Sequence, residues 1–161
     1  MKNLIILPVL LLTLLVGNPA SADFQNGFDA YERGDYATAL REFRPLAEQG
    51  NAGAQNNLGV MYEKGKGVSQ DDKTAVKWYR LAAKQGQANS QYNLGYMYEN
   101  GRGVLQDYVR AHMWYNLAAS QGGTEYATKN RDIVAKKMTP SQIKKAKKLA
   151  RECVKKNYKG C

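Results

Sequence analysis

Residues 54–89 read AQNNLGVMYEKGKGVSQDDKTAVKWYRLAAKQGQAN, and residues 90–125 read SQYNLGYMYENGRGVLQDYVRAHMWYNLAASQGGTE. When the two stretches are aligned without a gap, 20 of their 36 positions are identical. Repetition at a fixed period of about 20 to 50 residues is typical of solenoids, in which each unit stacks on the next. This stretch therefore predicts a repeat architecture, and the repetition is stronger evidence than any single residue.

Each copy is predicted to form two helices. In the first copy, apolar residues at helical spacing form a stripe along residues 54–62. The Gly-Lys-Gly turn at residues 65–67 follows, and because glycine accepts positive φ, it predicts the end of a helix and a sharp turn. A second helix should begin near Asp71 or Asp72, whose carboxylates suit an N-cap, and should end at Gly86.

The repeat carries a recognisable pattern, A-x-x-x-L-G-x-x-Y-x-x-G-x-G-V-x-x-D-x-x-x-A-x-x-W-x-x-A-A-x-Q-G. Residues 54–86 match it almost position by position, and residues 90–122 match it with Ser90 in place of the first Ala. In this pattern the chain resembles the Sel1-like repeat, a relative of the tetratricopeptide repeat. The resemblance implies an all-α fold, an α/α superhelical solenoid of helix pairs, and a role as a scaffold or adaptor in protein complexes.

The start of the chain is typical of a secretory signal. Lys2 precedes an apolar run over residues 4–16, and Ala20-Ser21-Ala22 follows. The apolar run is too short to span a bilayer comfortably. We therefore expect residues 1–22 to be a signal peptide cleaved after Ala22, and the mature chain to be periplasmic or secreted, without a transmembrane span. A retained N-terminal anchor is the alternative.

The mature chain is predicted to contain eight helices in four pairs. Residues 23–50 resemble an ordinary tetratricopeptide unit with a shorter turn, residues 51–89 and 90–123 are Sel1-like repeats, and residues 124–161 should form C-terminal capping helices with a basic tail. Thr139 followed by Pro140 and Gln142 is a capping box that predicts the start of the last helix. This closing helix is similar to the end of many secreted Sel1-like proteins.

Positive charge is concentrated at the C-terminal end. Residues 129–161 hold 12 Lys or Arg and 2 acidic residues, whereas residues 23–128 hold 11 Lys or Arg and 12 acidic residues. The last helix carries its cations opposite its apolar face: Lys144, Lys145, Lys147, Lys148, Arg151 and Lys155. They are either the solvated side of a capping helix or a contact for an anionic lipid, an acidic envelope polymer or an acidic protein. We expect no nucleic acid partner, because no aromatic residue is interleaved with the lysines for base stacking.

The two cysteines, Cys153 and Cys161, lie close together in the sequence. In an oxidising compartment such a pair predicts a disulfide, which here would fix the last turn of the chain rather than the whole fold. A reduced pair, or a bond between two chains, is the alternative.

The sequence favours a protein without catalytic activity. His112 is the only histidine, and it occupies a repeat position where the first copy has Val76. Ser141 and Lys144 spell an S-x-x-K motif, but the companion motifs of that enzyme class are absent, and no Cys/His cluster has metal-ligand spacing. We expect no cofactor. A secreted hydrolase acting on cell-wall material is the alternative from another class.

The resemblance to tetratricopeptide repeats implies that the first helix of each pair lines a concave face. The positions expected to face inward without packing against neighbours are Phe28, Tyr31, Asn56, Val60, Glu63, Tyr92, Tyr96 and Glu99. Aromatic rings flanked by polar groups suit a protein or peptide segment, because they give contact area at low entropy cost. Trp78 and Trp114 are instead predicted to pack between helices. The alternative is that the tyrosines only cover the surface or belong to the core.

Overall fold

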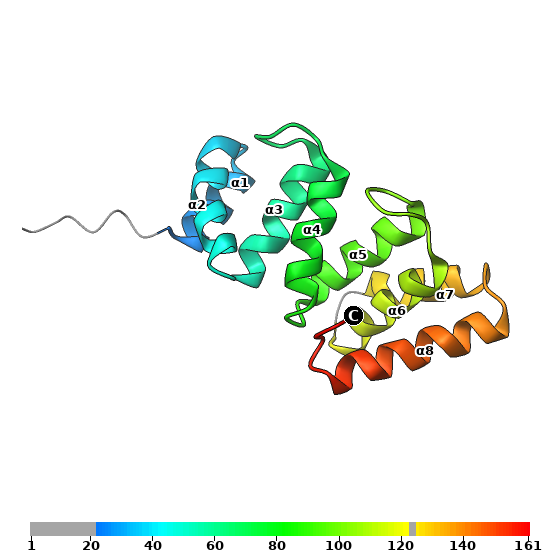
Figure 1. Ribbon diagram of the computed structural model, residues 1–161. Helices are drawn as coiled ribbons and strands as arrows, with labels where there is room; N and C mark the ends of the chain where they lie inside the picture. Colours follow the sequence, from blue (N-terminus) through cyan, green and yellow to red (C-terminus); the bar gives the residue numbers. More distant parts are fainter. Residues whose placement is uncertain (1–21, 123–124) are drawn as a thin grey trace, which may run out of the picture.

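The computed structural model describes residues 22–122 and 125–161, and within these ranges the chain forms eight helices and no strand. Figure 1 shows them following one another along the molecule. The helices are α1 (Phe24–Glu32), α2 (Tyr36–Glu48), α3 (Ala52–Lys64), α4 (Asp72–Ala83), α5 (Ala88–Asn100), α6 (Tyr108–Ser120), α7 (Glu125–Ala135) and α8 (Pro140–Lys155).

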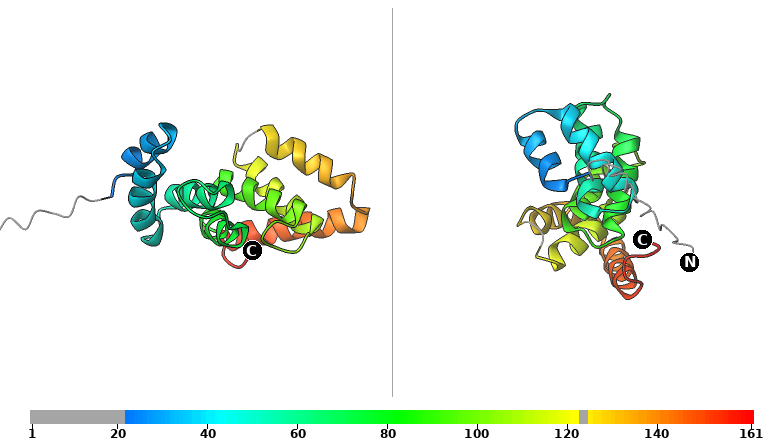
Figure 2. Two further views of the ribbon diagram at one scale, coloured as in Figure 1. Left: turned by 90° about the horizontal axis from the view of Figure 1, so that it is seen from above. Right: turned by 90° about the vertical axis from the view of Figure 1, so that its left-hand side faces the viewer.

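Helices α1 to α6 form three successive packed pairs. The predicted fourth pair is not found, because α7 and α8 each pack on α6 and hardly touch each other. Each helix packs on the next from α1 to α7, and α8 turns back to pack on α6. Viewed from above, the pairs lie side by side along an elongated body, with α8 at the far end from α1 (Figure 2). This arrangement confirms the predicted all-α solenoid of helix pairs.

The predicted turns and caps are present. Gly65 and Gly101 end the first helices of the two central pairs in the left-handed conformation, with φ of 64° and 66°. Asp71 and Asp107 are the N-caps of α4 and α6, and the Asp71 side chain accepts hydrogen bonds from two backbone N–H groups. Thr139 forms the predicted capping box with Gln142.

Two hydrophobic clusters form the core. The first lies between α1, α2 and α3, with Phe43, Leu58 and Met61 at its centre. The second extends from α4 to α8 and is built around Tyr79, Leu94, Met97, Trp114, Tyr115 and Leu117. Small residues on α8, including Ala146 and Ala150, allow it to approach α6 closely.

The two tryptophans differ in burial, although they occupy equivalent repeat positions. Trp114 is 2% exposed because α8 covers its side of α6. Trp78 on α4 is only partly buried and packs against the first cluster. Both tryptophans pack between helices as predicted, and their burial differs because their neighbours differ.

The described helices include none that is both long enough and apolar enough to cross a bilayer. The predicted signal peptide, residues 1–22, lies almost wholly outside the residues that the structure describes, so its cleavage after Ala22 stays a prediction.

Candidate partner-binding surface

The first helices of the pairs carry exposed aromatic side chains. Phe28 on α1 is 42% exposed, and Tyr96 on α5 is 37% exposed. Single exposed apolar side chains are ordinary on a protein surface, whereas a contiguous group of them marks an interaction site, so these rings are candidate contact points only together with their neighbours. Val60 on α3, also expected on this surface, is partly buried against the second core cluster.

Two residues that we expected to be free of packing on α3 are held by neighbouring helices, Asn56 by α5 of the next pair and Glu63 by α4 of its own pair. Asn56 is buried, and its Oδ1 accepts hydrogen bonds from Ser90 Oγ at 2.9 Å and Asn93 Nδ2 at 3.2 Å. Glu63 Oε2 accepts a bond of 2.6 Å from the Tyr79 hydroxyl. The expectation that these side chains do not pack against neighbours is therefore wrong, because repeat stacking brings polar groups of α4 and α5 onto them.

The equivalent positions of the third pair are held in the same way. The Tyr92 hydroxyl accepts a bond of 3.0 Å from Asn130 Nδ2 on α7, and its ring packs 5.5 Å from that of Tyr115. Glu99 Oε2 accepts a bond of 2.9 Å from the Tyr115 hydroxyl, and its Oε1 accepts one of 3.1 Å from Lys137 Nζ. The contacts with Asn130 and Lys137 bind α7 and the turn after it to the third pair.

A cation from each turn between paired helices reaches back to the preceding pair. Lys66 Nζ lies 4.9 Å from the ring centroids of both Tyr31 and Tyr36, a cation–π arrangement. In the next pair, Arg102 occupies the equivalent turn position. After α7, Lys137 reaches back to the Tyr108 ring at 5.4 Å as well as to Glu99.

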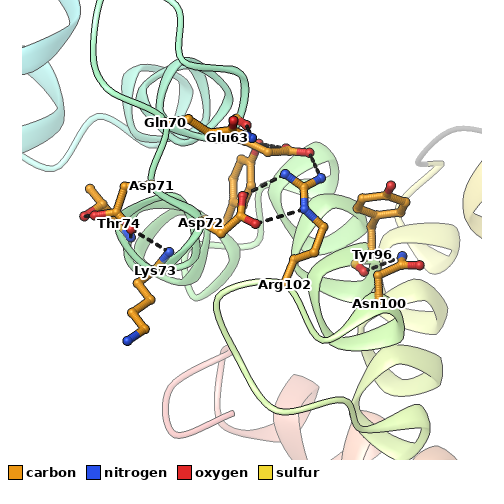
Figure 3. A network of polar contacts seen from close by, with 10 residues as sticks. Glu63, Gln70, Asp71, Asp72, Lys73, Thr74, Tyr96, Asn100 and Arg102 are labelled. Atoms are coloured by element: carbon orange, nitrogen blue, oxygen red, sulfur yellow. Dashed lines mark hydrogen bonds and ion pairs between the residues drawn. The ribbon is translucent and has the colours of Figure 1, made fainter.

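Arg102 makes the strongest of these contacts (Figure 3). Its Nη2 and Nε donate to the two carboxylate oxygens of Asp72 at 2.7 and 3.0 Å, and its Nη1 donates to Glu63 Oε1 at 2.9 Å. A bidentate contact between a guanidinium and a carboxylate fixes the relative orientation of the two groups and also contributes energy. The hydrogen bonds to Asp72 raise the pKa of Arg102, which is therefore permanently charged. Arg102 fixes the register of the third pair on the second.

Glutamines join the other ends of the helices. Gln55 Nε2 donates to the Ala47 carbonyl at 3.0 Å, and its Oε1 accepts from Gln85 at 2.8 Å. One repeat later, Gln91 donates to the Ala83 carbonyl at 3.2 Å and accepts from Gln121 at 2.7 Å. The identical glutamines of the two copies are thus inter-pair links, and they are not available to a ligand.

One exposed aromatic residue was missed by the sequence reasoning. Tyr126 on α7 is 64% exposed. Burial raises the pKa of Tyr92, the hydrogen bond from Asn130 lowers it, and Glu99, Tyr96 and Tyr126 raise it. We call Tyr92, Tyr96 and Tyr126 the aromatic surface. The 36-residue period aligns Tyr126 with Ser90 and Ala54, which are both buried, so the repeat gave no signal for its exposure.

The predicted basic face of α8 is exposed along its length. All six of its cations are exposed: Lys144, Lys145, Lys147, Lys148, Arg151 and Lys155. Only Lys148 has an ion-pair partner among the described residues, Glu152, at 3.8 Å. Three of them surround a shallow hollow of about 290 Å³ beside Ile143. The geometry therefore leaves this charge available to an external anion.

The remaining candidates lie apart from both surfaces. Cys153 and Cys161 are at disulfide-bonding distance, with Cα atoms 5.5 Å apart. His112 is 2% exposed, and its Nδ1 has no hydrogen-bond partner among the described residues. Burial lowers the pKa of His112, and Arg131 and Lys147 lower it further. Ser141 is exposed in the first turn of α8. No group of three or more His, Cys, Asp or Glu in the described residues could hold a metal ion.

Comparison with known proteins identifies the repeated unit. The family model of the Sel1 repeat matches residues 52–87 and again residues 88–123. Among curated proteins, an exopolysaccharide production negative regulator from Rhizobium leguminosarum bv. viciae is 43% identical over 49 residues, which are 30% of this chain and 18% of the regulator.

Two solved structures share the fold. The protein c5321, described as a protective antigen of uropathogenic Escherichia coli with an SLR fold, superimposes with a TM-score of 0.77 and 33% identity over 82% of this chain and 30% of its own. A Sel1 repeat protein from Oxalobacter formigenes superimposes with a TM-score of 0.64 and 36% identity, over 68% of this chain and 44% of its own. The chain spans less than half the length of each of these three relatives.

Proposed function

We propose that this chain, which carries two tandem Sel1 repeats, is a non-catalytic scaffold that binds a protein segment on the first helices of its pairs. Sel1 repeat proteins generally mediate protein–protein interaction. The observation that carries the proposal is the exposure of Phe28, Tyr96 and Tyr126 on α1, α5 and α7.

The aromatic surface suits a partner segment for two reasons. Tyrosine rings bury a large area while they fix only two side-chain torsions, so binding costs little entropy. The helices that carry them are also fixed in advance, because Asn56, Glu63, Tyr92 and Glu99 each form a hydrogen bond to the segment that follows their own pair. Pre-organised contacts reduce the ordering cost of association.

Affinity capture with the mature chain tests this function. We would compare the wild type with a Tyr96→Ala, Tyr126→Ala variant, since neither side chain is needed for the hydrogen bonds between pairs. Leu81→Ala is the matched control, because Leu81 is 48% exposed on α4. A partner should be lost with the tyrosine variant and retained with the control. Equal capture by all three proteins would remove the proposal.

We further propose that the chain works in the bacterial envelope. The support is the signal-like order of residues 1–22 and the cysteine pair, which suits an oxidising compartment. N-terminal sequencing of the protein from a fractionated native host tests this. A mature N-terminus at Asp23 in the periplasmic or secreted fraction is expected, and an intact N-terminus in the cytosol would contradict it.

A second candidate function, contact with an anionic lipid or envelope polymer, is favoured by the exposed and largely unpaired cations of α8. Retention on anionic vesicles should fall steeply between low and high salt, because salt screens exposed charges. Retention that does not respond to salt, or none at low salt, would remove it. Nothing in the described residues favours a hydrolase, since the only histidine is buried in the core.

A further inference from the structure

A cleft of about 390 Å³ lies between α6, α8 and the C-terminal turn. Tyr98 of α5 also lines it, but none of the three tyrosines of the aromatic surface does. Residues from all three segments line it, among them Arg110, Met113, Trp114, Lys145, Leu149 and Lys156. Clefts of about 300 to 1,000 Å³ are the usual size of small-molecule sites.

The floor of the cleft is apolar. Trp114 and Met113 on α6, which are 2% and 5% exposed, meet Leu149 and Cys153 on α8. Met113 stands where the preceding repeat has Lys77, whose side chain is exposed. This repeat therefore presents an apolar surface where its neighbour presents a charge, and α8 covers that surface without filling it.

The rim of the cleft carries an excess of available positive charge. Arg110, Lys145 and Lys156 line it together with two acids, Asp107 and Glu152. Asp107 is the N-cap of α6, where it accepts from the Arg110 backbone N–H at 3.0 Å and faces the Arg110 Nε at 3.8 Å. The exposed Arg110 guanidinium also lies 5.6 Å from the ring centroid of Tyr98, and Glu152 faces Lys148 at 3.8 Å. Lys145 and Lys156 have no ion-pair partner within the described residues.

We propose that this cleft binds a small amphipathic anion, with its apolar body on Trp114 and Met113 and its acidic group between Arg110, Lys145 and Lys156. Apolar burial supplies the affinity, and charge-assisted hydrogen bonds orient the acid. The cysteine pair closes one wall, because Cys153 and Cys161 both line the cleft. The inference does not depend on the proposed partner-binding function.

The probe 8-anilino-1-naphthalenesulfonate has this chemistry, an aromatic body with one sulfonate, and its binding is read from its own fluorescence. One probe should bind each folded chain. Binding should also quench Trp114 by energy transfer, which a Trp78→Phe variant isolates, since the chain has two tryptophans. The uncharged analogue N-phenyl-1-naphthylamine should bind about tenfold more weakly, because it lacks the charge-assisted contact.

Two variants with the same change in charge separate this site from general attraction to a basic protein. Arg110→Gln, Lys145→Gln, Lys156→Gln removes the rim cations, whereas Lys144→Gln, Lys147→Gln, Arg151→Gln removes three cations beside the other hollow of α8. The first should raise the Kd about tenfold and the second should leave it nearly unchanged, because only the rim touches the acid.

Three results would overturn the proposal. Equal weakening by both triple variants would show attraction to net charge alone. Several probes per chain, without quenching of Trp114, would show adventitious binding elsewhere. Probe fluorescence that rises only as circular dichroism reports unfolding would show exposed core instead of a site. Each variant is compared at an equal folded fraction, set from its urea unfolding curve.

Discussion

The second and third helix pairs have 20 of 36 positions in common, yet their outer faces differ. Leu81 on α4 is 48% exposed, whereas its counterpart Leu117 on α6 is 1% exposed. The difference arises from neighbours, since α7 and α8 both pack on α6. A repeat sequence therefore determines the two helices and their turn, while the flanking pairs determine which outer residues become core.

The same two pairs also differ in how they hold the segment that follows. Glu63 and Asp72 receive a guanidinium from Arg102, with contacts of 2.7 to 3.0 Å. The corresponding Glu99 and Tyr108 receive a single ammonium from Lys137. The junction after the second pair is thus fixed by several directed bonds, and the junction after the third is looser and more exposed.

The largest expected difference in stability is between the variants of the two tryptophans. Trp114→Ala should lower the free energy of unfolding by about 3–5 kcal/mol, because a fully buried ring leaves a cavity under α8. Trp78→Ala should cost roughly half as much, since part of that ring is already in contact with water. Urea unfolding followed by circular dichroism measures both. Equal losses would show that α8 does not distinguish the two pairs.

The cysteine pair lies in α8 and the C-terminal turn, and α8 covers the third pair and not the second. Cys153→Ser, Cys161→Ser should lower the free energy of unfolding by about 2–3 kcal/mol, because the bond closes a small loop in the unfolded chain. The cost should be the same when the wild type is reduced. Free thiols detected in the folded protein without reductant, or a dimer on a non-reducing gel, would contradict an intramolecular bond.

The next largest effect on the free energy of unfolding is expected from Arg102 and Lys137, the cations that reach back to the preceding pair. Arg102→Ala should lower the free energy of unfolding by about 2 kcal/mol, because three charge-assisted hydrogen bonds in a partly buried site are lost. Lys137→Ala should cost about 0.5 kcal/mol, since that side chain is 45% exposed. The two variants are compared in the same urea series. A larger loss for Lys137 would reverse the ranking of the two junctions.

The smallest effect concerns the position that is Val76 in one pair and His112 in the other. Burial lowers the pKa of His112 below its unfolded value of 6.5. Its neutral form is favoured on folding, so stability is full above about pH 6.5 and falls as the pH drops. Arg131 and Lys147, which face it from α7 and α8, add to this, and Asp132 opposes it.

His112→Val tests this pH dependence, because the chain has no other histidine. The free energy of unfolding of the wild type should fall between pH 7.5 and 5.5, by at most about 1.4 kcal/mol per pH unit. The variant should show a flat profile over the same range. A wild-type profile that is already flat would show that His112 is not buried as a neutral group.

Local signals were enough to predict the helices from the sequence. The glycine turns at Gly65 and Gly101, the Asp71 and Asp107 caps and the Thr139 capping box depend on a few adjacent residues, and each is found. These features need no knowledge of the neighbouring pairs, which explains why periodicity and capping rules could place them.

The candidate surface could be predicted only in part. The position of Phe28 and Tyr96 on first helices follows from the repeat, and both are exposed. Asn56 and Tyr92 were expected to be free, but Ser90 and Asn130 bind them from the segment that follows each pair. Such contacts between pairs cannot be read from one copy alone, because they join residues about one period apart.

Site-specific photo-crosslinking in the native host tests the central claim, that first-helix aromatics bind a partner protein. p-Benzoylphenylalanine would replace Tyr96 on α5 in one strain and Leu81 on α4 in another, since both side chains are exposed. The account predicts a discrete crosslinked protein from position 96 and none from position 81. A crosslink from position 81 alone would place the partner on the opposite helices and contradict the account.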